Sequence, residues 1–199
     1  MRTPYERARF AGIAGLALLL SAFGARASES PASALIPDFV RMQYAGQAGL
    51  MSAGPGYSWW HRQVELSASY GYVPVWVADR RVHVFSERNS FSFGSLNLPR
   101  HFALEPALAG VAANVTLGNQ YQLFLPKAQR DYYWPDALYF WFFTGAKLDY
   151  LPRHATGFHG IGTQVEVGTI NQYLKSYREN RDVDLGDILS LSLSAQLYL

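Results

Sequence analysis

The C-terminal end of the chain alternates strictly between apolar and polar positions. From Leu189 to Leu199 every odd-numbered residue is Leu or Ala, and the even-numbered residues are Ser, Ser, Ser, Gln and Tyr. Such period-2 alternation places the two sets on opposite faces of an extended strand. In a membrane barrel one face meets lipid and the other a polar lumen. The pattern predicts the closing strand of an outer-membrane β-barrel, and the alternative is an edge strand of a soluble sandwich.

Seven further segments have a similar pattern. They are Phe39–Ala45 and, approximately, Leu50–Trp60, Val64–Val77, Val82–Leu96, Phe102–Leu117, Leu138–Tyr150 and Phe158–Tyr173. Together they predict an all-β fold, an eight-stranded antiparallel transmembrane β-barrel of the outer membrane spanning residues 39–199. The connection near Gly46 and Gln47 is very short, and a single strand over 39–60 would reduce the count to seven. Bacterial single-chain barrels have even strand numbers, which favours eight.

The fourth segment departs from simple alternation. Its apolar parity changes between Val82 and Val84 on one side and Phe91 and Phe93 on the other. A β-bulge near Glu87–Asn89 would restore the register. The connections alternate between short ones (61–62, 97–101 and 151–157) and longer polar ones (118–136 and 175–186), as expected for periplasmic turns and outer loops.

The predicted inward faces carry charges of both signs. An eight-stranded barrel is just wide enough to be filled by side chains, so it is not expected to be a pore. Buried charges are costly unless paired. The inward charged set is Arg41, Glu65, Lys147, Asp149 and Glu166, with either Glu87 or Arg88. We interpret it as a neutralising lumen network, the alternative being a buried catalytic or proton-binding site.

The N-terminal segment 1–27 has the features of a cleavable signal peptide. Arg2, Arg7 and Arg9 precede the apolar stretch 10–23, and residues 25–27 form a small-x-small cleavage site. This segment carries four of the 17 Lys and Arg residues and one of the 15 Asp and Glu residues, so the remainder has 13 basic and 14 acidic residues. The basic balance therefore belongs to the signal, and a nucleic-acid partner is not expected. Residues 28–38 form a predicted periplasmic lead-in.

Catalytic, cofactor and metal sites find no support in the residue spacing. The chain lacks cysteine, and its histidines (His61, His83, His101, His154 and His159) have neither H-x₃-H nor H-E-x-x-H spacing. Ser190, Ser192 and Ser194 lie on the polar face of the last strand and are predicted to line the lumen. A serine nucleophile needs a base within hydrogen-bond reach, and the sequence has no G-x-S-x-G motif. The sequence therefore predicts no catalytic residues, no cofactor and no metal.

Aromatic residues gather near the predicted strand ends. Trp and Tyr anchor barrels at membrane interfaces, and this is the role predicted for Trp59, Trp60, Trp76, Tyr132, Tyr133, Trp134 and Trp141. The segment 132–134 could instead contact a ligand or lipid headgroup. The loop 177–182 mixes charge signs and suits either the phosphates and divalent ions of the outer leaflet or solvent.

In the second half of the chain, a strand ending in residues 165–174 is followed by a polar loop and a terminal strand. This arrangement, mainly over Gln164–Leu199, resembles the lipid A deacylases, the PagL-like acyloxyacyl-hydrolase barrels. The resemblance implies an eight-stranded outer-membrane fold and removal of an acyl chain from lipid A. The family carries a His-x-Ser-Asn motif here. Aligning Asn171 with its Asn places Gly168 at the His position and Ile170 at the Ser position, so both catalytic side chains would be absent.

Three functions remain open at this stage. The favoured one is an integral barrel of the cell outer membrane, with a filled lumen and a structural or binding role through its outer loops. Its expected partners are outer-membrane lipid, lipopolysaccharide and the barrel-insertion machinery, although Leu199 replaces the common terminal aromatic residue. The second is a lipid A or phospholipid acyl hydrolase. The third is a soluble periplasmic β-sandwich or lipocalin-like binder.

Overall fold

The structure is a computed structural model. It describes residues 36–79, 81–118, 121, 137–152, 159–180 and 184–199. The predicted signal peptide 1–27 and most of the lead-in therefore lie outside the described residues.

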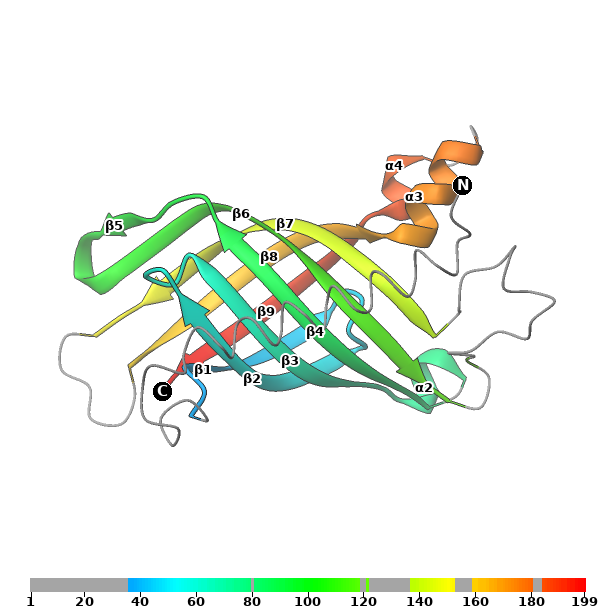
Figure 1. The fold of residues 1–199 in the computed structure, drawn as a ribbon, viewed down its shortest axis with the longest axis horizontal. Coiled ribbons are helices and arrows are strands. Elements are labelled where there is room, and N and C mark those ends of the chain that lie inside the picture. The colour runs from blue at the N-terminus through cyan, green and yellow to red at the C-terminus, as the bar shows by residue number, and fades with distance from the viewer. Residues whose placement is uncertain (1–35, 80, 119–120, 122–136, 153–158, 181–183) are drawn as a thin grey trace.

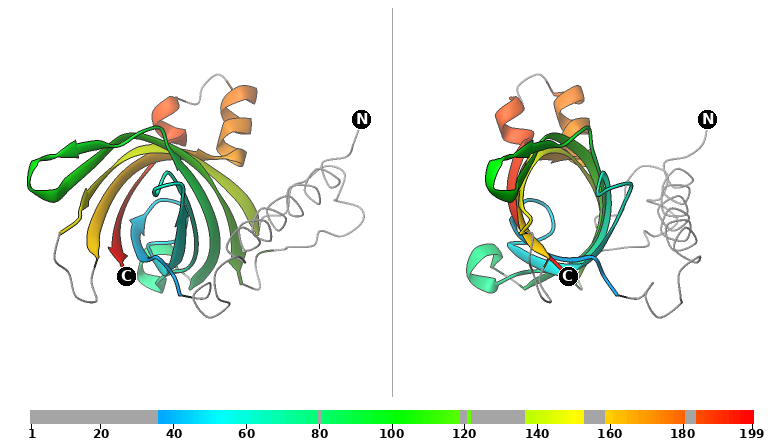
Figure 2. Two further views of the ribbon diagram at one scale, coloured as in Figure 1. Left: turned by 60° about the vertical axis from the view of Figure 1, so that its left-hand side comes forward. Right: turned by 90° about the vertical axis from the view of Figure 1, so that its left-hand side faces the viewer.

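Eight long antiparallel strands close into a barrel (Figure 1 and the right panel of Figure 2). They are β1 Phe39–Ala45, β2 Met51–Trp59, β3 Val64–Val73, β4 Val82–Ser92, β6 Phe102–Leu117, β7 Leu138–Tyr150, β8 Gly160–Ile170 and β9 Ser190–Tyr198. Each strand pairs with its neighbours in the chain, apart from the interposed β5, and β1 pairs with β9 to complete the ring. The predicted all-β barrel and its strand number are confirmed.

The short first connection is a tight turn between separate strands. The Ala45 backbone N–H donates to the Leu50 carbonyl oxygen at 2.9 Å. Gly46 and Gly49 have φ of +75° and +101°, a region in which glycine carries no Cβ penalty. The seven-strand alternative is therefore wrong, because the chain reverses between Ala45 and Met51.

The two ends of the barrel differ. One, here called the loop end, carries the helices α2 Val75–Ala78, α3 Asn171–Glu179 and α4 Leu185–Ile188 (Figure 1). The other, the turn end, carries the C-terminus and a short extra strand, β5 Leu96–Leu98, followed by the 3-10 turn Pro99–His101. The predicted turn over 97–101 thus contains the end of a small hairpin with β6.

Three predicted strands end earlier than their apolar patterns suggested. The fourth stops at Ser92 instead of near Leu96. The third stops at Val73, because Pro74 lacks the N–H needed for a strand ladder and precedes α2. The seventh stops at Ile170, and Asn171 begins α3 while its side-chain oxygen accepts from the Phe140 N–H at 2.9 Å. Residues 171–179, including part of the predicted fourth loop, are therefore helical.

The bulge predicted in the fourth strand is absent from β4, which pairs without interruption with both β3 and β6. Its parity change has a different cause: Val82 and Val84 are buried and share the inward side with Arg88. The register irregularity lies instead in the pairing of β6 with β7, between Glu105 and Leu108.

The two faces of the wall differ in chemistry. The outer face exposes Met42, Tyr44, Met51, Phe85, Phe142, Val165, Leu191, Leu193 and Leu197. The inner face buries Arg41, Gln43, Ser52, Glu65, Arg88, Glu105, Asn114, Lys147, Asp149, Gln164, Glu166, Ser192, Ser194 and Gln196. This is the reverse of a soluble barrel, in which the apolar face would fill the interior.

Candidate functional site in the barrel lumen

The lumen near the turn end is filled by a network centred on Glu65. The guanidinium of Arg41 donates to Glu65 Oε2 at 2.7 Å, and Lys147 Nζ lies 2.8 Å from Glu65 Oε1. Gln196 Nε2 also donates to Oε2, at 2.8 Å. Lys147 in addition contacts Glu105 Oε1 at 2.9 Å. One carboxylate on β3 thus joins side chains from β1, β7 and β9.

A second ion pair lies beside the first. Arg88 from β4 makes a bidentate contact with Glu166 from β8. The Arg88 guanidinium carbon lies 3.7 Å from the centroid of the Phe143 ring. Ser192 Oγ donates to Glu166 Oε2 at 2.8 Å, and Gln164 Nε2 donates to Oε1 at 2.5 Å. Arg41 Nη1 donates to the Gln164 side-chain oxygen at 2.9 Å and so links the two groups.

Aromatic residues close the turn end of the lumen. Tyr198 is 2% exposed, and its hydroxyl donates to Asp149 Oδ1 at 2.8 Å. Its ring packs edge-on against Phe39, with centroids 6.2 Å apart, and the Arg62 guanidinium carbon lies 3.6 Å from the ring centroid. These aromatic side chains and the ion pairs fill the turn-end half of the lumen.

The structure shows which of the predicted inward charges belong to this network. The predicted inward charges are all buried in it, and of the two alternatives on β4 it is Arg88 that faces inward. Glu87 faces outward, so that option is wrong. Glu105 was missed, because the β6–β7 irregularity changes its parity relative to the rest of the strand.

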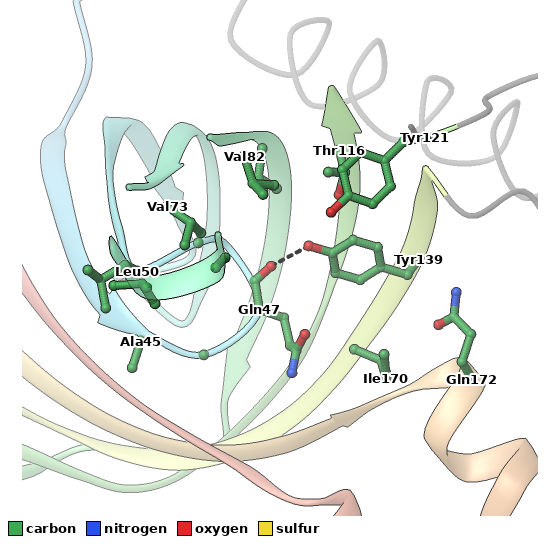
Figure 3. A pocket seen from close by; sticks show the side chains of 15 residues that line it. Ala45, Gln47, Leu50, Val73, Val82, Thr116, Tyr121, Tyr139, Ile170 and Gln172 are labelled. Carbon is green, nitrogen blue, oxygen red and sulfur yellow. Dashed lines mark hydrogen bonds between the residues drawn. The ribbon is translucent and has the colours of Figure 1, made fainter. Parts of the chain in front are cut away.

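The part of the lumen at the loop end is a cavity of about 630 Å³ (Figure 3). We call it the vestibule. Its apolar wall is formed chiefly by Leu50, Val73, Val77, Val82, Val84 and Ile170. Among the described residues its polar lining consists of Gln47, Thr116, Tyr121, Tyr139 and Gln172, and none of the described lining residues is charged. The Tyr139 hydroxyl donates to the Gln47 carbonyl oxygen at 2.6 Å, which ties the first turn to β7.

Unpartnered polar groups occur on the inner face next to the vestibule. Asn114 lies two positions before Thr116 on β6, is 0% exposed, and neither Nδ2 nor Oδ1 has a hydrogen-bond partner among the described residues. The indole N–H of Trp141, on the adjacent strand, is also unpartnered, as is Gln172 Oε1 in the vestibule lining. Trp141 is 1% exposed and packs on Phe143, so its predicted interfacial role is wrong.

The outer wall carries a smaller polar group. The Tyr70 hydroxyl lies 2.5 Å from His83 Nδ1, and Glu87 accepts a hydrogen bond from Asn89 further along β4. A depression of about 470 Å³ adjoins Glu87 and is lined partly by Ala68 and Ala113.

The remaining predicted positions are dispersed. His61 and His101 are exposed at the turn end, while His154 and the segment 132–134 lie outside the described residues. Trp60 and Trp76 are 70% and 81% exposed near opposite ends of the barrel. Ser192 and Ser194 line the lumen as predicted, and the Ser190 hydroxyl accepts from Gln47 Nε2. Across the described part of the chain, no three His, Cys, Asp or Glu residues are placed to hold a metal ion.

Comparison of the chain with protein-family models, curated proteins and solved structures gives no match. The resemblance to lipid A deacylases thus stays an expectation. At the aligned position Gly168, an added Cβ would come 2.5 Å from Trp141 Nε1, so the Trp141 ring occupies the adjacent space. None of the described helices is long and apolar enough to cross a membrane.

Proposed function

We propose that this protein is an integral β-barrel of the bacterial outer membrane, exported through the signal segment 1–27, that acts non-catalytically by binding at its loop end. The observation that carries the proposal is the inversion of the wall, with apolar side chains outside and paired charges inside. In water, the exposed Leu, Val, Phe and Met side chains would form an apolar surface far larger than soluble monomers carry.

Aromatic residues near both ends of the outer wall support the membrane location. Trp76, Tyr173 and Tyr177 are exposed on the helices of the loop end, and Trp60, Phe93, Phe102 and Tyr150 are exposed toward the turn end. Membrane barrels have such girdles at the two interfaces, where amphipathic rings meet headgroups and acyl chains.

The packed network favours a sealed barrel and argues against a solute channel. Conduction needs a continuous aqueous path, whereas the charges here are paired with one another at 2.7–2.9 Å. A barrel of eight strands leaves an interior that side chains fill. Binding therefore falls to the vestibule and the segments around it.

The first test is membrane fractionation of cells expressing the full chain, followed by gel migration with and without boiling. We expect the protein in the outer-membrane fraction, with a folded form that migrates differently from the boiled one, and N-terminal sequencing that begins at Ser28. In planar bilayers we expect no stable conductance. Recovery of soluble protein without detergent would contradict the proposal and favour a periplasmic sandwich or lipocalin-like binder.

A second candidate function is a lipid A or phospholipid acyl hydrolase. The specific observation in its favour is the outward position of His83, held by Tyr70, and of Glu87, because acyl-transfer chemistry on membrane lipid needs such groups on the wall. Mass spectrometry of lipid A from cells with and without the protein tests it. The hydrolase would be established if lipid A loses one acyl chain in cells with the wild-type protein and keeps it in cells with His83→Ala or Glu87→Gln. Unchanged lipid A with a folded barrel would leave the binding function.

A further inference from the structure

We propose that this protein forms a two-fold symmetric dimer in the membrane through the outer face of β3, β4 and β6, with Glu87 of each copy at the contact. The three strands are neighbours in the barrel, because β4 pairs with β3 on one side and with β6 on the other (Figure 1). The inference rests on the proposed function, since only a barrel that spans a membrane has lipid against this face.

Glu87 is the one charged side chain that the eight long strands place on the outer wall. It is the central residue of β4, is half-buried, and pairs with Ala68 on β3 and Ala113 on β6. None of the ion pairs among the described residues includes it. The other Asp, Glu, Lys and Arg residues of these strands are buried inside the barrel: Arg41, Glu65, Arg88, Glu105, Lys147, Asp149 and Glu166.

A carboxyl group in the middle of the wall needs polar neighbours when the wall faces hydrocarbon. Ionisable residues are rare in membrane-spanning segments, and those that occur pair with other polar groups and mark functional sites. Asn89, two positions along the same face of β4, donates one N–H to Glu87. A carboxyl group has two oxygens with about four lone pairs, so this bond does not satisfy it, and acyl chains offer no donor. The occupant of this face must therefore bring polar groups to the same depth.

A second copy of this chain brings matching groups to that depth. Copies inserted in the same orientation are related by a two-fold axis along the membrane normal, and such an isologous contact sets one patch against itself. The Glu87 and Asn89 side chains of one copy then face those of the other. A carboxamide has two N–H donors and an acceptor oxygen, so Asn89 of one copy can bond the Glu87 carboxyl of the other in either protonation state.

Small residues around Glu87 permit close approach of the two walls. The outer-wall depression of about 470 Å³ beside Glu87 is lined partly by Ala53, Pro55, Ala68 and Ala113. At interfaces within membranes, small side chains let backbones approach closely, and association then depends on packing and on hydrogen bonds between polar side chains. Both components of such an interface are thus present on the same face of the barrel.

The test uses the absence of cysteine from the chain, because a single introduced thiol then reports on one position. Ala113→Cys lies beside Glu87, and Ala195→Cys on the outer face of β9 is its matched control. β9 is the fourth strand from β4 in both directions around the barrel and so lies on the opposite side of the ring (right panel of Figure 2). Each full-length variant is folded into phosphatidylcholine vesicles at a low protein-to-lipid ratio and treated with a short bismaleimide. After boiling and electrophoresis, we expect a covalent dimer from Ala113→Cys and monomer from Ala195→Cys.

Substitutions of Glu87 test whether its carboxyl group holds the contact. In the Ala113→Cys background, Glu87→Leu should weaken dimerisation about tenfold, because leucine is compatible with lipid and forms no side-chain hydrogen bond. Glu87→Gln keeps an acceptor oxygen, adds donors and should restore dimerisation to within about twofold of the parent. Each variant is first checked for heat-modifiable migration, so that misfolding is not mistaken for loss of the contact.

Three results would overturn the inference. Equal cross-linking of Ala113→Cys and Ala195→Cys would show random collision, and undiminished cross-linking in Glu87→Leu would show that the carboxyl group does not hold the contact. A folded Ala113→Cys barrel that stays monomeric would mean that lipid or another protein covers this face. All three leave the membrane barrel intact, whereas recovery of soluble protein without detergent would contradict the proposed function itself.

Discussion

The two halves of the lumen differ in how side chains fill them. Toward the turn end, Glu65, Arg41 and Lys147 meet at 2.7–2.8 Å, and of their buried side-chain polar atoms only Arg41 Nε lacks a partner among the described residues. Toward the loop end, the described lining residues are apolar or uncharged polar, a cavity remains, and Asn114 is buried without a hydrogen-bond partner among the described residues. The comparison shows that paired charges fill the turn-end half, while the loop-end half keeps open space and unpartnered polar groups.

The sharpest way to break this comparison is to remove the centre of the network. Glu65→Leu leaves Arg41 and Lys147 buried without their main counter-charge, and removing one partner of a buried pair costs about 3–5 kcal/mol. Urea unfolding in lipid vesicles, followed by tryptophan fluorescence, measures the loss. Ser67→Ala, at the next inward position on β3, is the control and should change the free energy of unfolding by less than about 1 kcal/mol. Equal effects of the two changes would show that the network does not stabilise the barrel.

The second prediction contrasts the inside of the wall with the outside. Leu193 is 52% exposed and pairs with Val165, the central residue of β8. Leu193→Arg should cost about 2–4 kcal/mol, because it places a charge near the bilayer midplane. The same substitution at Leu199, just beyond β9, should cost only about 0–1 kcal/mol at the interface. Equal tolerance of arginine at both depths, measured by urea unfolding in vesicles, would argue against a membrane-spanning wall.

The third prediction reverses the sign of the first. Asn114→Leu replaces an unpartnered amide by an apolar side chain of similar size. Removing a buried polar group that has no partner should leave stability unchanged or raise it by about 1 kcal/mol. A loss comparable to that of Glu65→Leu would mean that Asn114 is paired in the folded protein and that the two halves of the lumen do not differ.

The smallest expected effect concerns the rim of the vestibule. Tyr139→Phe removes the hydrogen bond to the Gln47 carbonyl and should cost about 1 kcal/mol. The loosened turn should show faster amide hydrogen exchange at Ala45, whose N–H bonds to Leu50. Tyr150→Phe, exposed at the turn end, is a matched control in which the exchange of Ala45 should be unaltered. Identical exchange in wild type and Tyr139→Phe would show that this bond does not hold the rim.

Most of the strands, their faces and the inward serines could be predicted from alternation alone. Strand ends were misplaced where an apolar pattern continued past the residue at which the strand stops. Val75–Val77 extended the apolar run of β3, yet Pro74 ended the strand, and the run through Tyr173 continued into α3. Trp141 was assigned to the interface by residue type, although its parity on β7 is that of Lys147 and Asp149 and could have placed it inside.

The sequence by itself determined which side chains share a face, because in a strand this depends only on whether positions are odd or even. Only the tertiary structure decided which inward side chains meet. Glu65 and Lys147 are 82 positions apart, and their contact depends on the register of every intervening strand pair and on barrel closure through β1–β9 and β4–β6. The vestibule has the same origin, since a cavity is the space left after side chains from distant strands have packed, and no local pattern encodes it.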